Sequence, residues 1–145
     1  MSSNIEERIR LLLSVRRKLQ ALFIFAKLPQ ENAAEEATAS SDANITRIQR
    51  LLDGSDGLLL LVSAEEKSLL ELHLVDAMKW ETAIEAYRRM WPAEHSEVKK
   101  TYQLRQQGAL RKIRYYVERY ANTYDFSWLD DPLIDELAIQ DKRPE

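Results

Sequence analysis

The stretch IEERIRLLLSVRRKLQALFIFAKL, residues 5–28, decides the fold class of this chain. Its apolar side chains recur at alternating steps of four and three residues, which is typical of an amphipathic helix with a heptad-like seam: Ile5, Ile9, Leu12, Leu19, Phe23 and Ala26. Arg16 occupies the one step that the apolar residues leave out. We expect Asn4 or Ser3 to cap the helix and Pro29 to end it. Such a seam fits two arrangements, a helix packed on its own domain or the interface of a homodimer.

Composition extends the helical prediction to the whole chain. Its 145 residues are 45% hydrophobic and 31% charged, as in a single globular domain, and they include only three glycines and four prolines. So few turn-forming residues favour an all-α helical bundle over a sandwich or a barrel. The absence of cysteine excludes disulfides and thiol chemistry, and the two histidines lie far apart in the sequence. We therefore expect neither a metal nor a cofactor.

The apolar runs of the sequence are short. The longest cover residues 21–26 and 58–62, whereas a membrane-spanning helix needs roughly 20 apolar residues. Glu6 and Glu7 near the N-terminus are not typical of a secretory signal. The sequence therefore predicts a cytoplasmic protein without a membrane partner.

Four regions are predicted along the chain: an N-terminal helix at 1–29, a linker at 30–42, a helical domain at 43–122 that holds a candidate helix-turn-helix, and an acidic, hydrophobic C-terminal tail at 123–145. The linker is small, polar and acidic, although its alanines are also compatible with a frayed helix. Local signals divide the helical domain into a short helix at 43–52, a break at Gly54-Ser55-Asp56-Gly57, a capping box from Ser63 to Glu66, a helix at 80–91 and a last helix at 97–122. Gly108 within the last helix predicts a bend or a junction.

Charge is distributed unevenly at the end of the chain. Residues 97–120 carry seven basic and two acidic side chains, a local balance of +5, whereas residues 121–145 carry two basic and seven acidic ones, a balance of −5. The basic stretch also contains several glutamines. Arginine and glutamine form paired hydrogen bonds with purine edges, and lysine suits phosphate, so this helix has the composition of a nucleic-acid reader. The alternative is a basic helix that faces solvent or pairs with acids of the tail.

The C-terminal tail combines acids with large apolar side chains, which leaves three interpretations. The tail packs against the domain, or it recognises a partner protein such as RNA polymerase, or it mimics nucleic acid and covers the basic helix until DNA displaces it. The candidate partner-binding residues are Phe126, Trp128, Leu129, Leu133 and Ile134.

Residues 64–80, AEEKSLLELHLVDAMKW, resemble the opening of a helix-turn-helix similar to region four of bacterial sigma factors. In that pattern an acid-rich cap precedes a Leu-Leu-Glu-Leu helix, a short turn and a tryptophan that starts the next helix. Ile84, Leu104 and residues 109–113 resemble later parts of the module. The ArpU and RinA group of phage late-transcription regulators joins this module to a helical N-terminal part. The resemblance implies DNA contacts from Ser96, Lys99, Lys100, Gln103, Gln106 and Gln107, and phosphate contacts from Arg111, Lys112 and Arg114.

We therefore predict a DNA-binding transcriptional regulator, related to phage proteins and homodimeric. The alternative is a non-enzymatic helical adaptor, immunity-type or assembly protein that acts through protein contacts. We do not expect an enzyme, because the sequence has no phosphate-binding glycine loop and Pro92 interrupts the one spacing, Arg89 to His95, that resembles HEPN ribonucleases.

Overall fold

A computed structural model describes residues 4–27, 35–93 and 98–140, with 35–41 and 140 described by their backbone alone. The elements in chain order are α1 (Ile5–Ala26), α2 (Glu35–Leu59), α3 (Ala64–Leu70), the π-helical turn η1 (Glu71–Val75), α4 (Trp80–Met90), α5 (Lys99–Arg119), the 3-10 turn η2 (Ser127–Asp130) and α6 (Pro132–Gln140). The described part of the chain contains no strand, so the predicted all-α fold is confirmed. None of the described helices is long and apolar enough to cross a bilayer.

Helix α1 forms as its sequence predicts and packs on its own domain. The Asn4 side chain accepts a hydrogen bond from the Glu7 amide at 3.0 Å, which caps the helix. Three residues of the seam, Ile9, Leu12 and Leu19, are completely buried in the core of this chain. Arg16 at the missing step forms an ion pair with Asp56 of α2. The buried part of the seam therefore offers no surface to a second copy.

Helix α2 corrects two predictions. It begins at Glu35, so residues 35–42 of the predicted linker are helical, while residues 30–34 lie outside the described range. It also continues through the expected break at residues 54–57. Close packing, rather than a turn, explains the glycine at position 54, because a Cβ atom there would lie 2.6 Å from the ring of Trp128. The ring of Trp128 thus lies directly against the backbone of α2.

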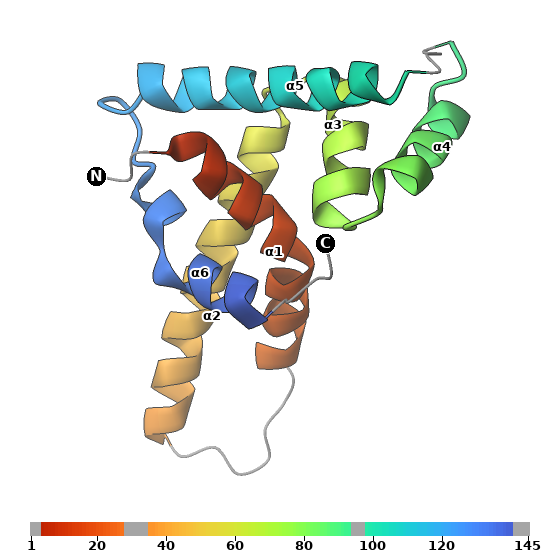
Figure 1. Ribbon diagram of the computed structural model, residues 1–145. Helices are drawn as coiled ribbons and strands as arrows, with labels where there is room; N and C mark the ends of the chain where they lie inside the picture. The colour runs from red at the N-terminus through yellow and green to blue at the C-terminus, as the bar shows by residue number, and fades with distance from the viewer. Residues whose placement is uncertain (1–3, 28–34, 94–97, 141–145) are drawn as a thin grey trace.

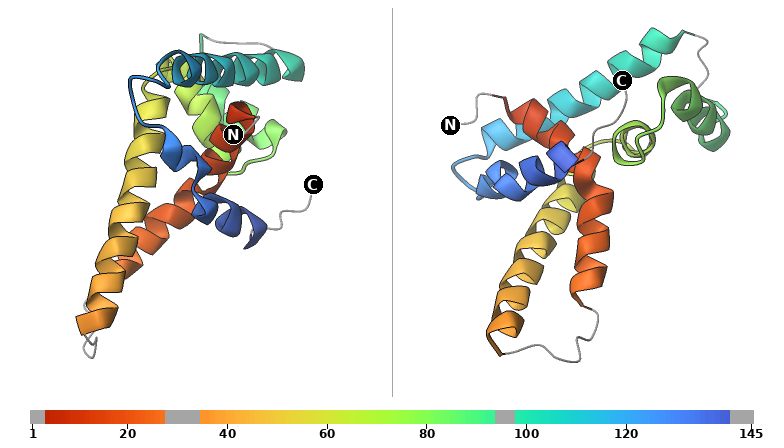
Figure 2. Two further views of the ribbon diagram at one scale, coloured as in Figure 1. Left: turned by 90° about the vertical axis from the view of Figure 1, so that its left-hand side faces the viewer. Right: turned by 60° about the horizontal axis from the view of Figure 1, so that its bottom comes forward.

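Two hydrophobic cores share helix α5, which lies along one edge of the molecule (Figure 1). The larger core joins α1 and α2 to the C-terminal half of α5 and to α6. The smaller core joins α3, η1 and α4 to Tyr102 of α5. The further views also show α5 as an outer element (Figure 2). One side of this helix therefore has no other described helix over it.

The segment from α3 to α5 follows local signals closely. The capping box is confirmed, since Ser63 Oγ accepts from the Glu66 amide at 3.1 Å and Glu66 Oε1 accepts from the Ser63 amide at 2.9 Å. Helix α4 ends at Met90, within one residue of the prediction. Helix α5 runs unbroken through Gly108, so the predicted bend or junction is wrong.

Candidate nucleic-acid interface

Helix α5 has a buried side and an exposed side. Its buried residues are Tyr102, Gln106, Ala109, Leu110, Ile113 and Val117. We define the outward face of α5 by the residues on the opposite side between positions 100 and 115, which are Lys100, Gln103, Leu104, Gln107, Gly108, Arg111 and Tyr115. The acid Glu118 continues the same side toward the end of the helix. Leu104 is 55% exposed and Tyr115 is 62% exposed. The outward face therefore mixes cationic, amide and apolar groups.

Four of the nine predicted DNA-binding residues belong to the outward face: Lys100, Gln103, Gln107 and Arg111. The two cations are exposed, and neither has an ion-pair partner among the residues that the structure describes. Both are therefore available to an anionic partner. Ser96 lies outside the described range.

Three further candidates are half-exposed and form ion pairs with acids of other helices. Lys99 Nζ lies 3.1 Å from Glu81 Oε1 of α4, and Lys112 Nζ lies 2.8 Å from Glu66 Oε1 of α3. Arg114 contacts Glu6 of α1 at 3.2 Å. These pairs tie α5 to its neighbours.

Among these three ion pairs, the Lys112–Glu66 pair contains the most buried acid. Burial alone would raise the pKa of Glu66, but the hydrogen bonds from Lys112 and from Ser63 outweigh burial, so this pKa lies below its ordinary value. Glu66 therefore stays ionised and keeps its lysine partner near neutral pH. The outward face retains its positive charge mainly from Lys100 and Arg111.

Gln106 turns inward and is only 3% exposed, so it is not part of the outward face. Its Oε1 atom lies 2.9 Å from Nδ1 of His73, and the ring of His73 stacks on Trp80 with centroids 3.8 Å apart. Because an amide oxygen only accepts, Nδ1 carries the hydrogen of this bond. Burial lowers the pKa of His73, although the hydrogen bond to Gln106 partly offsets it. Gln106 thus links α5 to η1.

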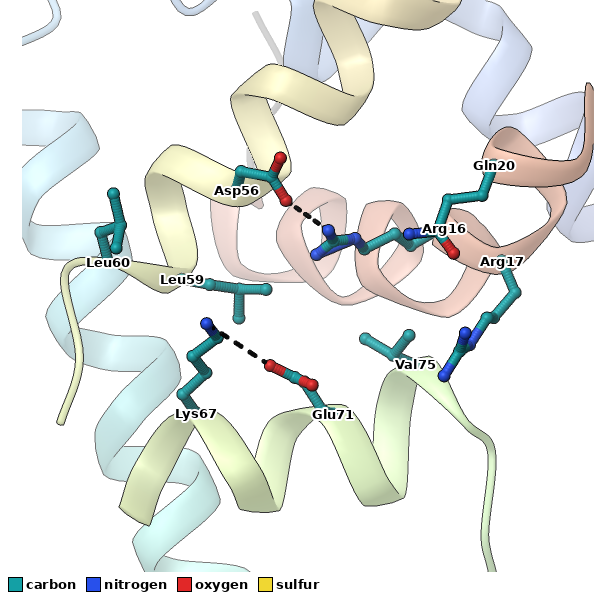
Figure 3. Close-up of a pocket in the computed structure, with 9 residues that line it drawn as sticks. All are labelled: Arg16, Arg17, Gln20, Asp56, Leu59, Leu60, Lys67, Glu71 and Val75. Carbon is teal, nitrogen blue, oxygen red and sulfur yellow. Dashed lines mark hydrogen bonds and ion pairs between the residues drawn. The ribbon is translucent and has the colours of Figure 1, made fainter. Parts of the chain in front are cut away.

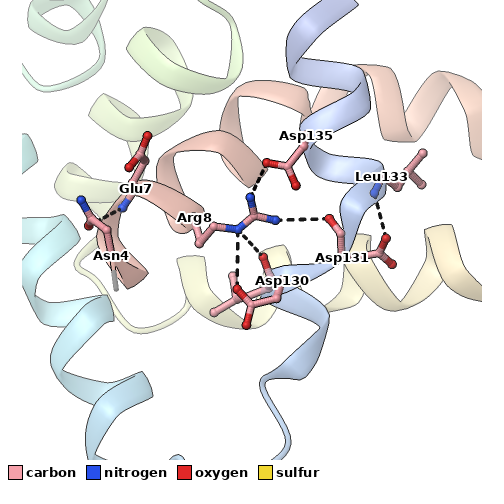
Figure 4. Close-up of polar contacts among 8 residues, drawn as sticks. Asn4, Glu7, Arg8, Asp130, Asp131, Leu133 and Asp135 are labelled. Carbon is pink, nitrogen blue, oxygen red and sulfur yellow. Dashed lines mark hydrogen bonds and ion pairs between the residues drawn. The ribbon is translucent and has the colours of Figure 1, made fainter. Parts of the chain in front are cut away.

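The acidic tail does not neutralise α5 within the described residues. Its acids meet arginines of α1 and α2 instead. Asp130 and Asp135 pair with Arg8 (Figure 4). Asp131 pairs with Arg47, and Asp125 with Arg50. The hydrogen bond from Arg47 holds the pKa of Asp131 below its ordinary value despite partial burial.

The apolar residues of the tail fill this chain's own larger core. Leu129 and Ile134 are buried, and Phe126, Trp128 and Leu133 are partly buried against the same core. Of the three interpretations, packing against the domain is the arrangement that the structure has. The described tail contacts α5 through Phe126 and Tyr116 but does not cover the outward face. Residues 141–145 lie outside the described range. The five candidates for partner contact are thus in use inside the chain.

A polar cavity of about 380 Å³ lies between α1, α2 and the α3–η1 segment (Figure 3). Three cations line it, but each already has an acidic partner: Arg16 pairs with Asp56, Arg17 with Asp76, and Lys67 with Glu71. The described residues also contain no cluster of three histidine or acidic side chains that could hold a metal ion. The outward face of α5 is therefore the stronger candidate site.

Comparisons of the chain with family models, curated proteins and solved structures found no match. Helices α4 and α5 are consecutive, but residues 94–97 between them lie outside the described range, so the turn of a helix-turn-helix is not among the described features. The resemblance to phage late-transcription regulators stays a prediction.

Proposed function

We propose that this protein is a DNA-binding regulator of transcription that contacts duplex DNA through the outward face of α5. One observation carries the proposal: Lys100, Gln103, Gln107 and Arg111 share an exposed helix face that the acidic tail leaves uncovered. Lysine and arginine are suited to phosphate oxygens, and glutamine is suited to the donor and acceptor pair of adenine in the major groove. The face thus combines groups for anchoring with groups for base recognition.

The dimensions of the face fit a duplex. Lys100 and Arg111 are eleven residues apart, which corresponds to about 16 Å along a helix. Phosphates line both walls of the major groove, so cations near the two ends of a helix lying in the groove would have phosphate oxygens beside them. The two glutamines lie between the cations and would then face base edges.

The charge distribution supports the same proposal. The chain as a whole carries a net charge of −3, which alone would repel DNA. The arginines of α1 and α2 take up the tail acids, so the described tail does not cancel the positive charge of Lys100 and Arg111. The Lys99–Glu81 and Lys112–Glu66 pairs are open to solvent on the lysine side, so these lysines are also placed to contact phosphate.

Fluorescence anisotropy tests the proposal. Labelled duplexes are tiled across the neighbourhood of the gene and titrated with the protein at about 50 mM and about 200 mM salt. We expect one fragment to bind tightly and to weaken steeply as salt rises. Equal binding to all fragments would reduce the site to a non-specific basic face, and no binding at the lower salt would refute the proposal.

A protein adaptor is the second candidate, and a separate observation favours it. At the C-terminal end of α1, Ile24 is 64% exposed and Phe25 is 67% exposed. Exposed apolar side chains that adjoin one another are typical of protein contact surfaces. An Ile24→Ser/Phe25→Ser variant would then lose capture of a partner protein, while a DNA-binding regulator would keep its affinity for the duplex.

A further inference from the structure

Gly108 has no structural explanation within the described chain. It lies inside α5, its φ angle is not in the left-handed region, and a Cβ atom there would meet nothing within 4 Å. Glycine in a helix interior is less favourable than alanine because its backbone loses more freedom on folding. Gly54 differs, because the ring of Trp128 leaves no room for a Cβ atom there. Packing therefore explains Gly54 but neither Gly108 nor Gly57, where a Cβ atom would also meet nothing within 4 Å.

The position of Gly108 supplies an explanation. It lies on the outward face, one turn after Leu104 and one turn before Arg111 and Lys112. A missing side chain at this point lets another molecule come closer to the helix backbone than any neighbouring residue allows, which is a common use of glycine at ligand contacts. The closest approach would thus fall between the glutamines and the C-terminal cations of the face.

We infer that Gly108 is the point at which bound duplex DNA comes closest to α5. This inference rests on the function proposed above. Duplex DNA is favoured as the occupant because Arg111 and Lys112 flank the glycine on one side and Gln107 on the other, which complements phosphate and base edges respectively. A substituted side chain would hold the groove away from Gln107 and from the cations.

The test separates stability from binding. Gly108→Ala and Gly108→Leu are compared with Gly57→Ala and Gly57→Leu, because Gly57 is likewise a helical glycine with open space around its Cβ position but lies on α2. Both alanine variants should raise Tm by about 3 °C through higher helix propensity. Only the Gly108 variants should weaken binding to the duplex, by about 5-fold for alanine and by more than about 30-fold for leucine.

The outcomes are distinct. Gly108 variants that melt at or above the parental temperature yet bind DNA more weakly, with unchanged binding by the Gly57 variants, support the inference. Gly108 variants that bind as tightly as the parent overturn it and leave the proposed function intact. A parent protein that binds no duplex refutes the proposed function itself.

Discussion

The basic stretch at residues 97–120, which contains α5, and the acidic end at residues 121–145 carry equal and opposite charge in the sequence, yet the structure uses the two charges differently. The tail pairs its acids with arginines of α1 and α2, next to buried apolar anchors such as Leu129 and Ile134. Helix α5 buries its apolar side and leaves Lys100 and Arg111 exposed. The charges of the tail hold the tail on the domain, whereas those of Lys100 and Arg111 are available to a partner. Neighbouring segments of opposite charge do not pair unless packing brings them together.

The largest expected effect separates the tail from the interface. Ile134 is completely buried, so Ile134→Ala should lower the free energy of unfolding by about 3 kcal/mol through lost burial and a residual cavity. Urea unfolding measures this loss. Under conditions where the variant is folded, its affinity for DNA should equal that of the parent. A variant with parental stability and weaker DNA binding would show that the tail itself contacts DNA.

Charge reversal on the outward face should weaken DNA binding and leave stability nearly unchanged. Lys100→Glu/Arg111→Glu should weaken DNA binding by about 30-fold, because two phosphate contacts become repulsive, and should change unfolding by less than about 0.5 kcal/mol. Lys27→Glu/Lys79→Glu is the matched control, since it makes the same charge change on exposed residues outside α5. If both pairs weaken binding equally, net charge rather than the outward face controls the interaction.

Gly54→Ala sharpens the contrast between Gly54 and Gly108. The added methyl group would press on the ring of Trp128, so we expect a loss of about 1.5 kcal/mol in thermal or urea unfolding. Gly108→Ala should instead stabilise the fold. A Gly54→Ala variant as stable as the parent would mean that the Trp128 ring does not lie against α2 in solution.

The smallest expected effect is on the pH dependence of stability and involves His73 of η1, which is hydrogen-bonded to Gln106 of α5. The lowered pKa of His73 means that the unfolded chain takes up a proton more readily than the folded chain. Stability from neutral His73 is therefore present above about pH 6.5 and is lost as the pH falls toward the folded pKa. We expect His73→Gln to reduce the drop in Tm between about pH 7.5 and about pH 5.5. An identical drop in parent and variant would assign that pH dependence to other groups.

Local signals predicted the helices well where the cause is local. The Asn4 cap, the capping box at Ser63 and the start of α4 at Trp80 depend on residues within one turn. The length of α2 was missed because Gly54 was interpreted as a helix breaker, whereas its partner, Trp128, lies far along the sequence.

The sequence predicted only part of the candidate site, because contacts between distant residues also decide which side chains of α5 are exposed. Lys100, Gln103, Gln107 and Arg111 face outward, but Gln106 does not. The spacing of Tyr102, Gln106, Ala109 and Ile113 places Gln106 on the apolar side of the helix, and this signal in the sequence could have identified it. Its partner His73 sits on a π-helical turn, for which the sequence showed no signal.

The salt dependence of DNA binding tests the central claim most directly. The logarithm of the affinity is measured against the logarithm of the salt concentration for the parent and for Lys100→Ala/Arg111→Ala. Each phosphate contact contributes about 0.9 to the slope, so the variant should lose about two units of slope while keeping the parental Tm. An unchanged slope, or a parent protein whose binding does not depend on salt, would contradict the assignment of the outward face as the DNA-binding surface.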